Sequence, residues 1–291
     1  MKLVRTIVML LSSAAVLATT AEGQERTVTR EIGRTTEREL NVVLSSSFGS
    51  VTVIRGEPEK MLVIETEQAG DDVPTYLDYA IRNRVGYADI TLGERRKNNE
   101  EKKRSFNLKD FNKGKWYLKL SDAVPVSFDI ELGVGSGDFN LTGLQVKDFT
   151  LSAGASNVTL AFDEPNRTRI DNLSIESGVT KFDGRNLGNA NFRHLHFQGG
   201  MGAYSLDFGG MPNNEVDVDI EIGLGVLTVY VPRGIGARVS YDKSWMSRVD
   251  CDEDFHETGT NDYLSDNYQD ATGKMNIRID SGLGSIKIRR R

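Results

Sequence analysis

Apolar and polar residues alternate through the middle of the chain. Phe128, Ile130 and Leu132 are separated by two acidic residues, and the same alternation returns over residues 216–222, where four apolar residues are separated by three acidic ones. A period of two is typical of a β-strand that buries one face and leaves the other in water. The alternation therefore predicts strands, each with one buried face.

The alternating segments recur at a nearly constant interval, and a glycine-containing turn interrupts each of them. The turn glycines are spaced 24, 22 and 23 residues apart, at Gly154, Gly178, Gly200 and Gly223. Five copies of the pattern fill residues 128–231, a sixth begins at Ile277, and an earlier relative begins at Val42. A fixed period of about 20–50 residues indicates a repeat architecture.

We expect an all-β fold, a repetitive single-domain β-solenoid-like rack of short stacked strands with glycine turns, over residues 38–291. One unit is too small to bury its apolar face alone, so neighbouring units have to stack. Strands are also predicted at Leu40–Ile54 and Met61–Glu67, before the main repeats. Two stretches break the pattern, and we expect irregular insertions at 93–115 and 241–274.

The first 23 residues have the pattern of a secretory signal peptide. Lys2 and Arg5 precede a mostly apolar run over residues 6–17, and small residues follow it. Such a run is too short for a stable membrane-spanning helix. We expect cleavage after residues 1–23, no transmembrane segment after cleavage, and a periplasmic or extracellular location. Residues 24–37 are polar and predict a flexible N-terminal lead.

Composition narrows the classes of partner. The chain of 291 residues carries a net charge of −6, and acidic and basic residues are mixed along it. Such a balance argues against nucleic acid as a partner, because phosphate backbones are bound by basic surfaces. Cys251 is the only cysteine, so an internal disulfide is excluded.

Several stretches resemble bacterial toast-rack proteins, which are akin to the extracytoplasmic domain of LiaF-like, cell wall-active antibiotics response proteins and to adhesin-type proteins built of glycine-turn β-repeats. The stretches that carry the resemblance are Leu120-SDAVPVSFDIELGVGSGDFNLTGLQVKDFTLSAGAS, Ile175-ESGVTKF, Asn186-LGNANF and Val226-LTVYVPRGIGARV. As a pattern, the resemblance covers roughly residues 40–288. It implies a stacked β-strand rack in the cell envelope, and it brings no catalytic residues with it.

From these observations we expect a non-enzymatic, exported cell-envelope protein without a cofactor. Its rigid β-repeat surface would meet an envelope protein or a cell-wall glycan, and LiaF-like relatives connect the family with the envelope-stress response. The alternative is a carbohydrate-active enzyme on a β-solenoid scaffold. That enzyme would need two carboxylates that converge in one groove.

Three groups of residues have side chains that metals or reactive chemistry use. His194 and His196 lie two apart on a predicted strand and share a face, as two imidazole ligands would. Four acidic residues offer oxygen ligands of the kind that Ca²⁺ takes: Asp250, Asp252, Glu253 and Asp254. No known ligand spacing accompanies either group, so we expect solvated side chains and no metal site. Carboxylates beside Cys251 raise its pKa, which argues against a nucleophile.

The stretch 241–274 combines acidic and aromatic residues and is the candidate interaction surface. Aromatic side chains with a polar tip are enriched at interfaces. The residues that we assign to this surface are Trp245, Asp252, Asp254, Phe255, Tyr263 and Tyr268. The alternative is a structural cap, in which the same aromatics pack back onto the open end of the stack.

Overall fold

The described strands all belong to one mixed β-sheet. The computed structural model describes residues 26–68, 74–93, 114–210, 215–242 and 247–291. Within these ranges, 16 strands join in a single sheet, and one short 3-10 helix, η2 (Leu187–Ala190), is present. The all-β prediction is therefore confirmed.

The sheet is made of long strands and short strands. In chain order they are β1 (Arg26–Gly33), β2 (Glu39–Arg55), β3 (Lys60–Gln68), β4 (Thr75–Arg82), β5 (Val85–Leu92), β6 (Gly114–Leu120), β7 (Pro125–Asn140), β8 (Gln145–Ala161), β9 (Ile170–Arg185), β10 (Phe192–Asp207), β11 (Glu215–Val231), β12 (Gly236–Asp242), β13 (Ser247–Cys251), β14 (Phe255–Gly259), β15 (Asp262–Ser265) and β16 (Lys274–Arg290). Seven strands, β2, β7 to β11 and β16, have 16 or 17 residues. The other strands are shorter.

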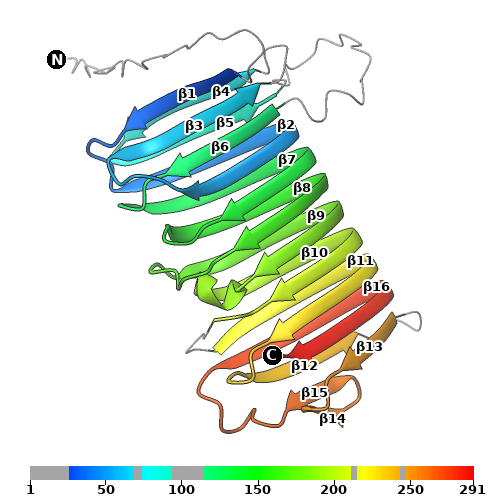
Figure 1. The fold of residues 1–291 in the computed structure, drawn as a ribbon. Helices are drawn as coiled ribbons and strands as arrows, with labels where there is room; N and C mark the ends of the chain where they lie inside the picture. Colours follow the sequence, from blue (N-terminus) through cyan, green and yellow to red (C-terminus); the bar gives the residue numbers. More distant parts are fainter. Residues whose placement is uncertain (1–25, 69–73, 94–113, 211–214, 243–246) are drawn as a thin grey trace, which may run out of the picture.

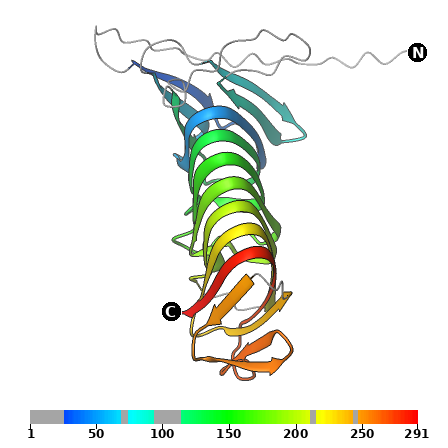
Figure 2. The same cartoon turned by 90° about the vertical axis from the view of Figure 1, so that its right-hand side faces the viewer.

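Each long strand bends once, so that it forms an arch, and the arches lie one beside the next (Figure 2). Their order is β2, β7, β8, β9, β10, β11, β16, and neighbours run parallel. The register keeps equivalent apolar positions side by side: Phe128, Phe149, Leu173, Leu195, Val218 and Ile277. The predicted repeat thus corresponds to one arch.

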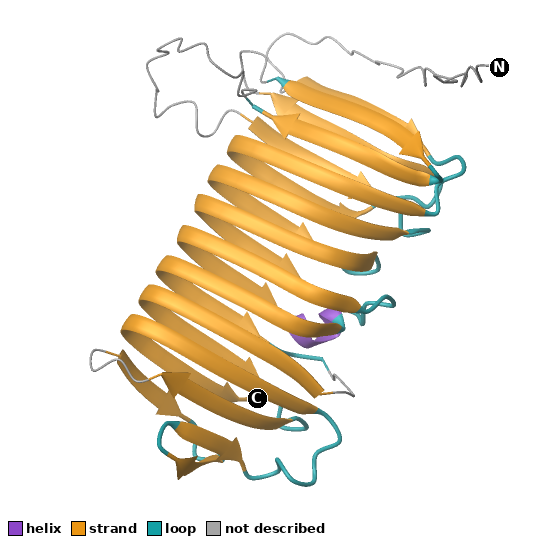
Figure 3. Cartoon of the chain, turned by 180° about the vertical axis from the view of Figure 1, so that it is seen from behind, coloured by secondary structure: helices purple, strands orange, loops and turns teal. Residues whose placement is uncertain are grey.

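The two halves of each arch belong to opposite walls of the stack (Figures 1 and 3). We call the N-terminal halves the first wall and the C-terminal halves the second wall. Near the N-terminus, β5 and β4 extend the first wall, and β6, β3 and β1 extend the second. At the other end, β12, β15 and β14 extend the first wall, and β13 extends the second.

The hydrophobic core fills the space between the two walls. Its buried side chains form one cluster that runs from Ile32 to Ile288. Aromatic rings link neighbouring arches, and the Phe182 and Phe197 ring centroids, on β9 and β10, lie 5.2 Å apart. Fully burying a side chain of this size contributes about 1.5–3 kcal/mol. Stacking therefore supplies the stabilisation that no single arch could.

Glycine is required at the bends because neighbouring backbones touch there. A Cβ atom on Gly178 would lie 2.8 Å from the carbonyl oxygen of Gly154, and one on Gly154 would lie 2.7 Å from that of Gly133. Contacts this short with backbone cannot be relieved by moving a side chain. Gly135 also has φ of +143°, a conformation that other residues rarely adopt. The bends are therefore fixed by backbone packing.

Our prediction of a flexible lead over residues 24–37 is wrong for most of its length. Residues 26–33 form β1, which pairs antiparallel with β3, and Ile32 is buried. The Arg30 guanidinium donates a hydrogen bond to the carbonyl oxygen of Thr75. The sequence of this segment is polar because an edge strand contributes few residues to the core. Its threonines and its valine nevertheless favour a strand.

The two predicted insertions have different outcomes. Most of 93–115, residues 94–113, lies outside the described residues, as does the predicted signal peptide over 1–23. The stretch 241–274 is not irregular throughout, because it contains β13, β14 and β15. At the end of the stack, β13 pairs with β16, β15 pairs with β12, and β14 pairs with β15.

Candidate interaction surface

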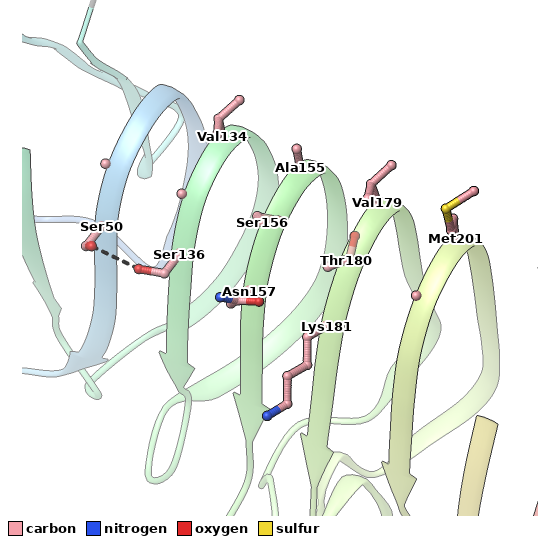
Figure 4. Close-up of a pocket in the computed structure, with 13 residues that line it drawn as sticks. Ser50, Val134, Ser136, Ala155, Ser156, Asn157, Val179, Thr180, Lys181 and Met201 are labelled. Carbon is pink, nitrogen blue, oxygen red and sulfur yellow. Dashed lines mark hydrogen bonds between the residues drawn. The ribbon is translucent and has the colours of Figure 1, made fainter. Parts of the chain in front are cut away.

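A row of apolar residues follows the outer edge of the bends, with one residue on each arch. We call it the apical row, and the register places its members side by side: Phe48, Val134, Ala155, Val179, Met201, Leu224 and Leu283. Neighbouring strands are about 4.8 Å apart, so the row is a continuous line of apolar side chains. Figure 4 shows four of its members pointing away from the strands.

Much of the apical row is exposed to solvent. Val179 is 62% exposed, Met201 51% and Leu283 40%. Phe48 is partly buried and packs against the core. Scattered apolar side chains are normal on protein surfaces, whereas contiguous ones mark interaction sites. The apical row is therefore a candidate contact surface.

A shallow pocket lies beside the apical row on the side of the second wall (Figure 4). Its volume is about 680 Å³, and Gly49, Gly135 and Gly202 contribute backbone to it. The Ser136 hydroxyl donates a hydrogen bond of 2.9 Å to the Ser50 hydroxyl at its rim, and Asn157 and Lys181 continue the polar side. The surface thus combines an apolar line with a polar shelf.

The apical row was not predicted from the sequence, although a signal for it was present. Val134, Leu224 and Leu283 each stand between two glycines, in the sequence Gly-x-Gly. We interpreted these glycines only as turn residues. The backbone contacts that require glycine on both sides also force the residue between them outward. An apolar residue at that position therefore predicts an exposed apolar side chain.

The described part of the predicted 241–274 surface packs against the end of the stack. Phe255 is buried in the core cluster, and the Arg290 guanidinium lies 5.6 Å from its ring centroid. Asp252 accepts a hydrogen bond of 2.7 Å from the backbone N–H of Arg290. Asp254 forms an ion pair with Arg233. These contacts have the form of the structural cap that we set against the interaction surface.

The remaining members of that predicted surface are dispersed. Tyr263 stacks on Tyr241, with ring centroids 5.9 Å apart, and the Tyr268 ring lies 5.1 Å from the Lys274 ammonium. Trp245 lies outside the described residues. An interaction through this segment stays a prediction.

Arg290 is the centre of the contacts at this end. Its guanidinium donates to the carbonyl oxygens of Ile235, at 2.9 Å, and Arg233, at 3.0 Å, and to the Asn267 side-chain oxygen at 3.0 Å. Burial lowers the pKa of Arg290, and Asp254 opposes that shift. The two Nη atoms of this buried guanidinium thus bond to three oxygen atoms and join the segment to the last long strand, while its Nε lies 3.7 Å from Asp254 and has no hydrogen-bond partner among the described residues.

The other candidate residues have ordinary surroundings. His194 Nδ1 lies 3.3 Å from Asp217 Oδ2 on the exposed first wall. A hydrogen bond from Arg289 and its charge lower the pKa of Asp250. Burial, assisted by the charge of Asp250, raises the pKa of the Cys251 thiol to about 11. Among the described residues, no group of three or more His, Cys, Asp or Glu side chains is placed to hold a metal ion.

Solved structures that align with most of this chain include two bacterial proteins. A protein from Clostridium sporogenes ATCC 15579, provisionally described as a cell adhesion protein, is 18% identical and aligns over 92% of this chain and 100% of that one, with a TM-score of 0.46. A protein from Parabacteroides merdae ATCC 43184, provisionally described as an adhesin, is 12% identical over 92% and 97%, with a TM-score of 0.30. No curated protein matches the sequence.

The part of the chain with a family match reaches from the N-terminal region to β9. The family is described as the N-terminal domain of toast_rack, DUF2154, and its model matches residues 20–184. In the part of the chain that the structure describes, no helix is long and apolar enough to span a membrane. Because the match covers more than half of the sequence, this protein belongs to the toast-rack N-terminal domain family.

Proposed function

We propose that this chain is an exported, non-enzymatic protein of the cell envelope, and that its arches form a β-solenoid-like rack that presents a rigid surface to a protein or a cell-wall glycan. The observation that carries the proposal is the apical row, where Val179, Met201 and Leu283 expose apolar side chains in register. The signal-like residues 1–23 support export.

Rigidity makes such a surface suitable for binding. The bends cannot relax without separating backbone atoms that are in contact, as at Gly154 and Gly178. A preformed surface loses little conformational freedom when a partner binds, so more of the contact energy appears as affinity. The line of apical side chains is therefore already arranged before any partner arrives.

The pKa shifts of two carboxyl groups do not fit the general acid that the alternative, a carbohydrate-active enzyme, would need. A glycosidase needs a general acid whose pKa is raised. Burial raises the pKa of Glu37, but hydrogen bonds from the Tyr79 hydroxyl and from Thr35 outweigh it and lower the pKa below its ordinary value. The pKa of Asp250 is also lowered. Both shifts are opposite to that of a general acid.

A set of substitutions in the apical row tests the proposed surface. The variant V179T/M201Q/L283T removes exposed apolar contacts, and the control N172S/Q198S changes exposed polar residues on the first wall. Both are expected to melt like the wild type, since surface changes alter stability by about 0.5 kcal/mol or less. Binding to purified cell-wall glycan, and photo-crosslinking to envelope proteins from position 201, are the two measurements.

We expect the apical variant to lose about tenfold or more in one of the two measurements, because single interface contacts often contribute more than 1 kcal/mol. The control should keep wild-type binding. Equal binding by wild type, control and apical variant would show that the apical row is not the contact surface. Sensitivity of a deletion strain to cell wall-active antibiotics tests the envelope-stress role separately, and N-terminal sequencing of the exported chain tests cleavage near Gln24.

A further inference from the structure

The outer face of the first wall has a second surface near the N-terminus, where β4 and β5 extend the sheet beside β2 (Figure 1). We call it the β4–β5 face and define it by five outward side chains: Tyr76 and Asp78 on β4, Tyr87 and Asp89 on β5, and Val43 on β2. Asp78 is opposite Asp89, and Asp89 is opposite Val43. All but Tyr87 line a groove of about 1010 Å³.

Large apolar groups on this face are exposed. Tyr76 is 44% exposed and Val43 is 45% exposed, and Tyr87 is exposed to a similar degree. Tyrosine is among the residues that dominate binding at protein interfaces, because it adds a large contact area with little loss of side-chain freedom. The apolar part of the face has the character of a binding surface for a protein.

The face carries two negative charges, and Arg30, which lines the same groove, is hydrogen-bonded to the carbonyl oxygen of Thr75 and forms no ion pair with either of them. Among the described residues, neither Asp78 nor Asp89 has an ion-pair or hydrogen-bond partner. Some acidic side chains elsewhere on the sheet do have partners, as in the Glu65–Lys119 pair at 2.6 Å, whereas the opposed Glu221 and Asp280 have none among the described residues and lack the neighbouring tyrosines. Like charges directly opposite each other on neighbouring strands are destabilising. Local conflicts of this kind are expected at functional sites, where a ligand removes them.

We propose that the β4–β5 face binds an arginine-rich segment of a partner protein. Charge complementarity requires a cationic partner, and a guanidinium group fits both kinds of side chain on the face. It can stack on the Tyr76 ring while it donates two parallel hydrogen bonds to the Asp78 or Asp89 carboxylate. A lysine ammonium satisfies only the charge. An uncharged glycan would leave the two carboxylates opposed, and a polyanion would be repelled.

This proposal goes beyond the proposed function because it concerns a different surface and names a partner class. The groove is lined by β2, β4, β5 and β7 with Arg30 of β1 at its border, whereas the pocket beside the apical row lies on the second wall and shares no lining residue with it. Substitutions in one surface leave the other intact, so either proposal can fail alone.

Peptides of alternating glycine and arginine, or glycine and lysine, with five charges each, are the probes. Fluorescence anisotropy at physiological salt measures their affinity for the full chain. The test variant is D78N/D89N, and the matched control is E221Q/D280N, which neutralises another opposed and exposed carboxylate pair on the same wall. Tyr76→Ala tests the stacking contribution, and thermal melts show that each variant is folded.

We expect D78N/D89N to weaken the arginine peptide about tenfold or more, as is usual for the loss of close charge pairs at an interface. The control should change the affinity less than about twofold, Tyr76→Ala should weaken binding severalfold, and the lysine peptide should bind more weakly. Equal loss in both double variants, equal affinity for the two peptides, or no binding would overturn the proposal. Displacement by an uncharged glycan hexamer would also overturn it. The proposal would also be overturned if the arginine peptide bound only after residues 95–112 were replaced by a Gly/Ser linker. In that case basic residues of the chain itself would occupy the β4–β5 face.

Discussion

Asn166 takes the place of a missing strand partner, and its removal should destabilise the stack measurably. It lies in the turn between β8 and β9 and is buried. Its side-chain oxygen accepts from the Val146 N–H at 3.0 Å, and its amide donates to the carbonyl oxygens of Val146, at 2.7 Å, and Ala190, at 3.1 Å. The pairing of β8 with β9 begins only at Phe149. Val146 pairs with Val126 of β7 on one side, and on the other side the Asn166 side chain bonds to it where β9 does not reach.

The size of the effect follows from these three bonds. Asn166→Ala removes all of them and leaves three buried backbone groups without their partner. A net contribution of about 1 kcal/mol per hydrogen bond predicts a loss of about 3 kcal/mol. This corresponds to a change of roughly 100-fold in an equilibrium constant. The loss is large for one residue in a turn, because turn substitutions usually have small effects.

Two measurements and one control test this prediction. Urea unfolding gives the change in the free energy of unfolding. Hydrogen exchange reports the Val146 amide directly, and we expect it to become up to about 100-fold faster. The control is Asn172→Ala, the same chemical change at an exposed position on β9, which should alter stability by about 0.5 kcal/mol or less.

A second variant separates hydrogen bonding from shape. Asn166→Asp keeps an acceptor for the Val146 N–H but turns a carboxylate toward the carbonyl oxygens of Val146 and Ala190. The folded state would then favour the protonated form, so the pKa of the new carboxyl should be raised. Stability from such a group is present at low pH and is lost as the pH rises through the raised pKa. A loss below about 1 kcal/mol in Asn166→Ala, or an Asp variant whose stability does not depend on pH, would refute the reasoning.

Three further predictions concern the bend, the cap and the N-terminal end. Gly178→Ala should cost about 1–3 kcal/mol in urea unfolding, because its Cβ would meet the carbonyl oxygen of the preceding arch; no loss would contradict the proposed backbone contact. Arg290→Met should release residues 247–270 to limited proteolysis while the arches stay resistant, since it removes the donor to Asn267 in this segment and the donors to the adjoining turn at Arg233 and Ile235; unchanged cleavage would contradict this. Tyr79→Phe removes a hydrogen bond to Glu37 and should therefore raise the pKa of that carboxyl group. Because a lowered pKa stabilises the fold above the ordinary value of 4.5 and this stabilisation is lost as the pH falls, acid unfolding of the variant should move to higher pH. An unchanged acid transition would exclude this role.

The arches could be predicted because they follow from local patterns that repeat. Phe128, Ile130 and Leu132 alternate with acidic residues, and all three are buried. The turn spacing then brings equivalent positions of successive copies into register. The strand β1 was missed because it is an edge strand with a weak apolar pattern, and an edge is defined by its single neighbour rather than by its own sequence.

The ends of the stack could not be predicted in the same way, since their contacts join residues far apart in the chain. In the sequence, Arg290 is one of several basic residues near the C-terminus, and nothing distinguishes it from an exposed side chain. In the structure it is buried against Phe255 and donates a hydrogen bond to the carbonyl oxygen of Arg233. The opposition of Asp78 and Asp89 depends on the register of a hairpin. Charged residues have no periodicity that reveals which of them will be covered or brought together.

Stacking explains where the apical side chains point but not why they are apolar. The contacts at Gly154 and Gly178 leave no room for a side chain, so the residue after each glycine has to turn outward. Any outward residue would satisfy that geometry, and charged or polar side chains are the usual choice on a solvated sheet. Contact between neighbours at about 4.8 Å adds some stabilisation to an apolar line. If this contact were the whole reason, V179T/M201Q/L283T should unfold at lower urea concentration, whereas a contact surface requires unchanged stability with lost binding.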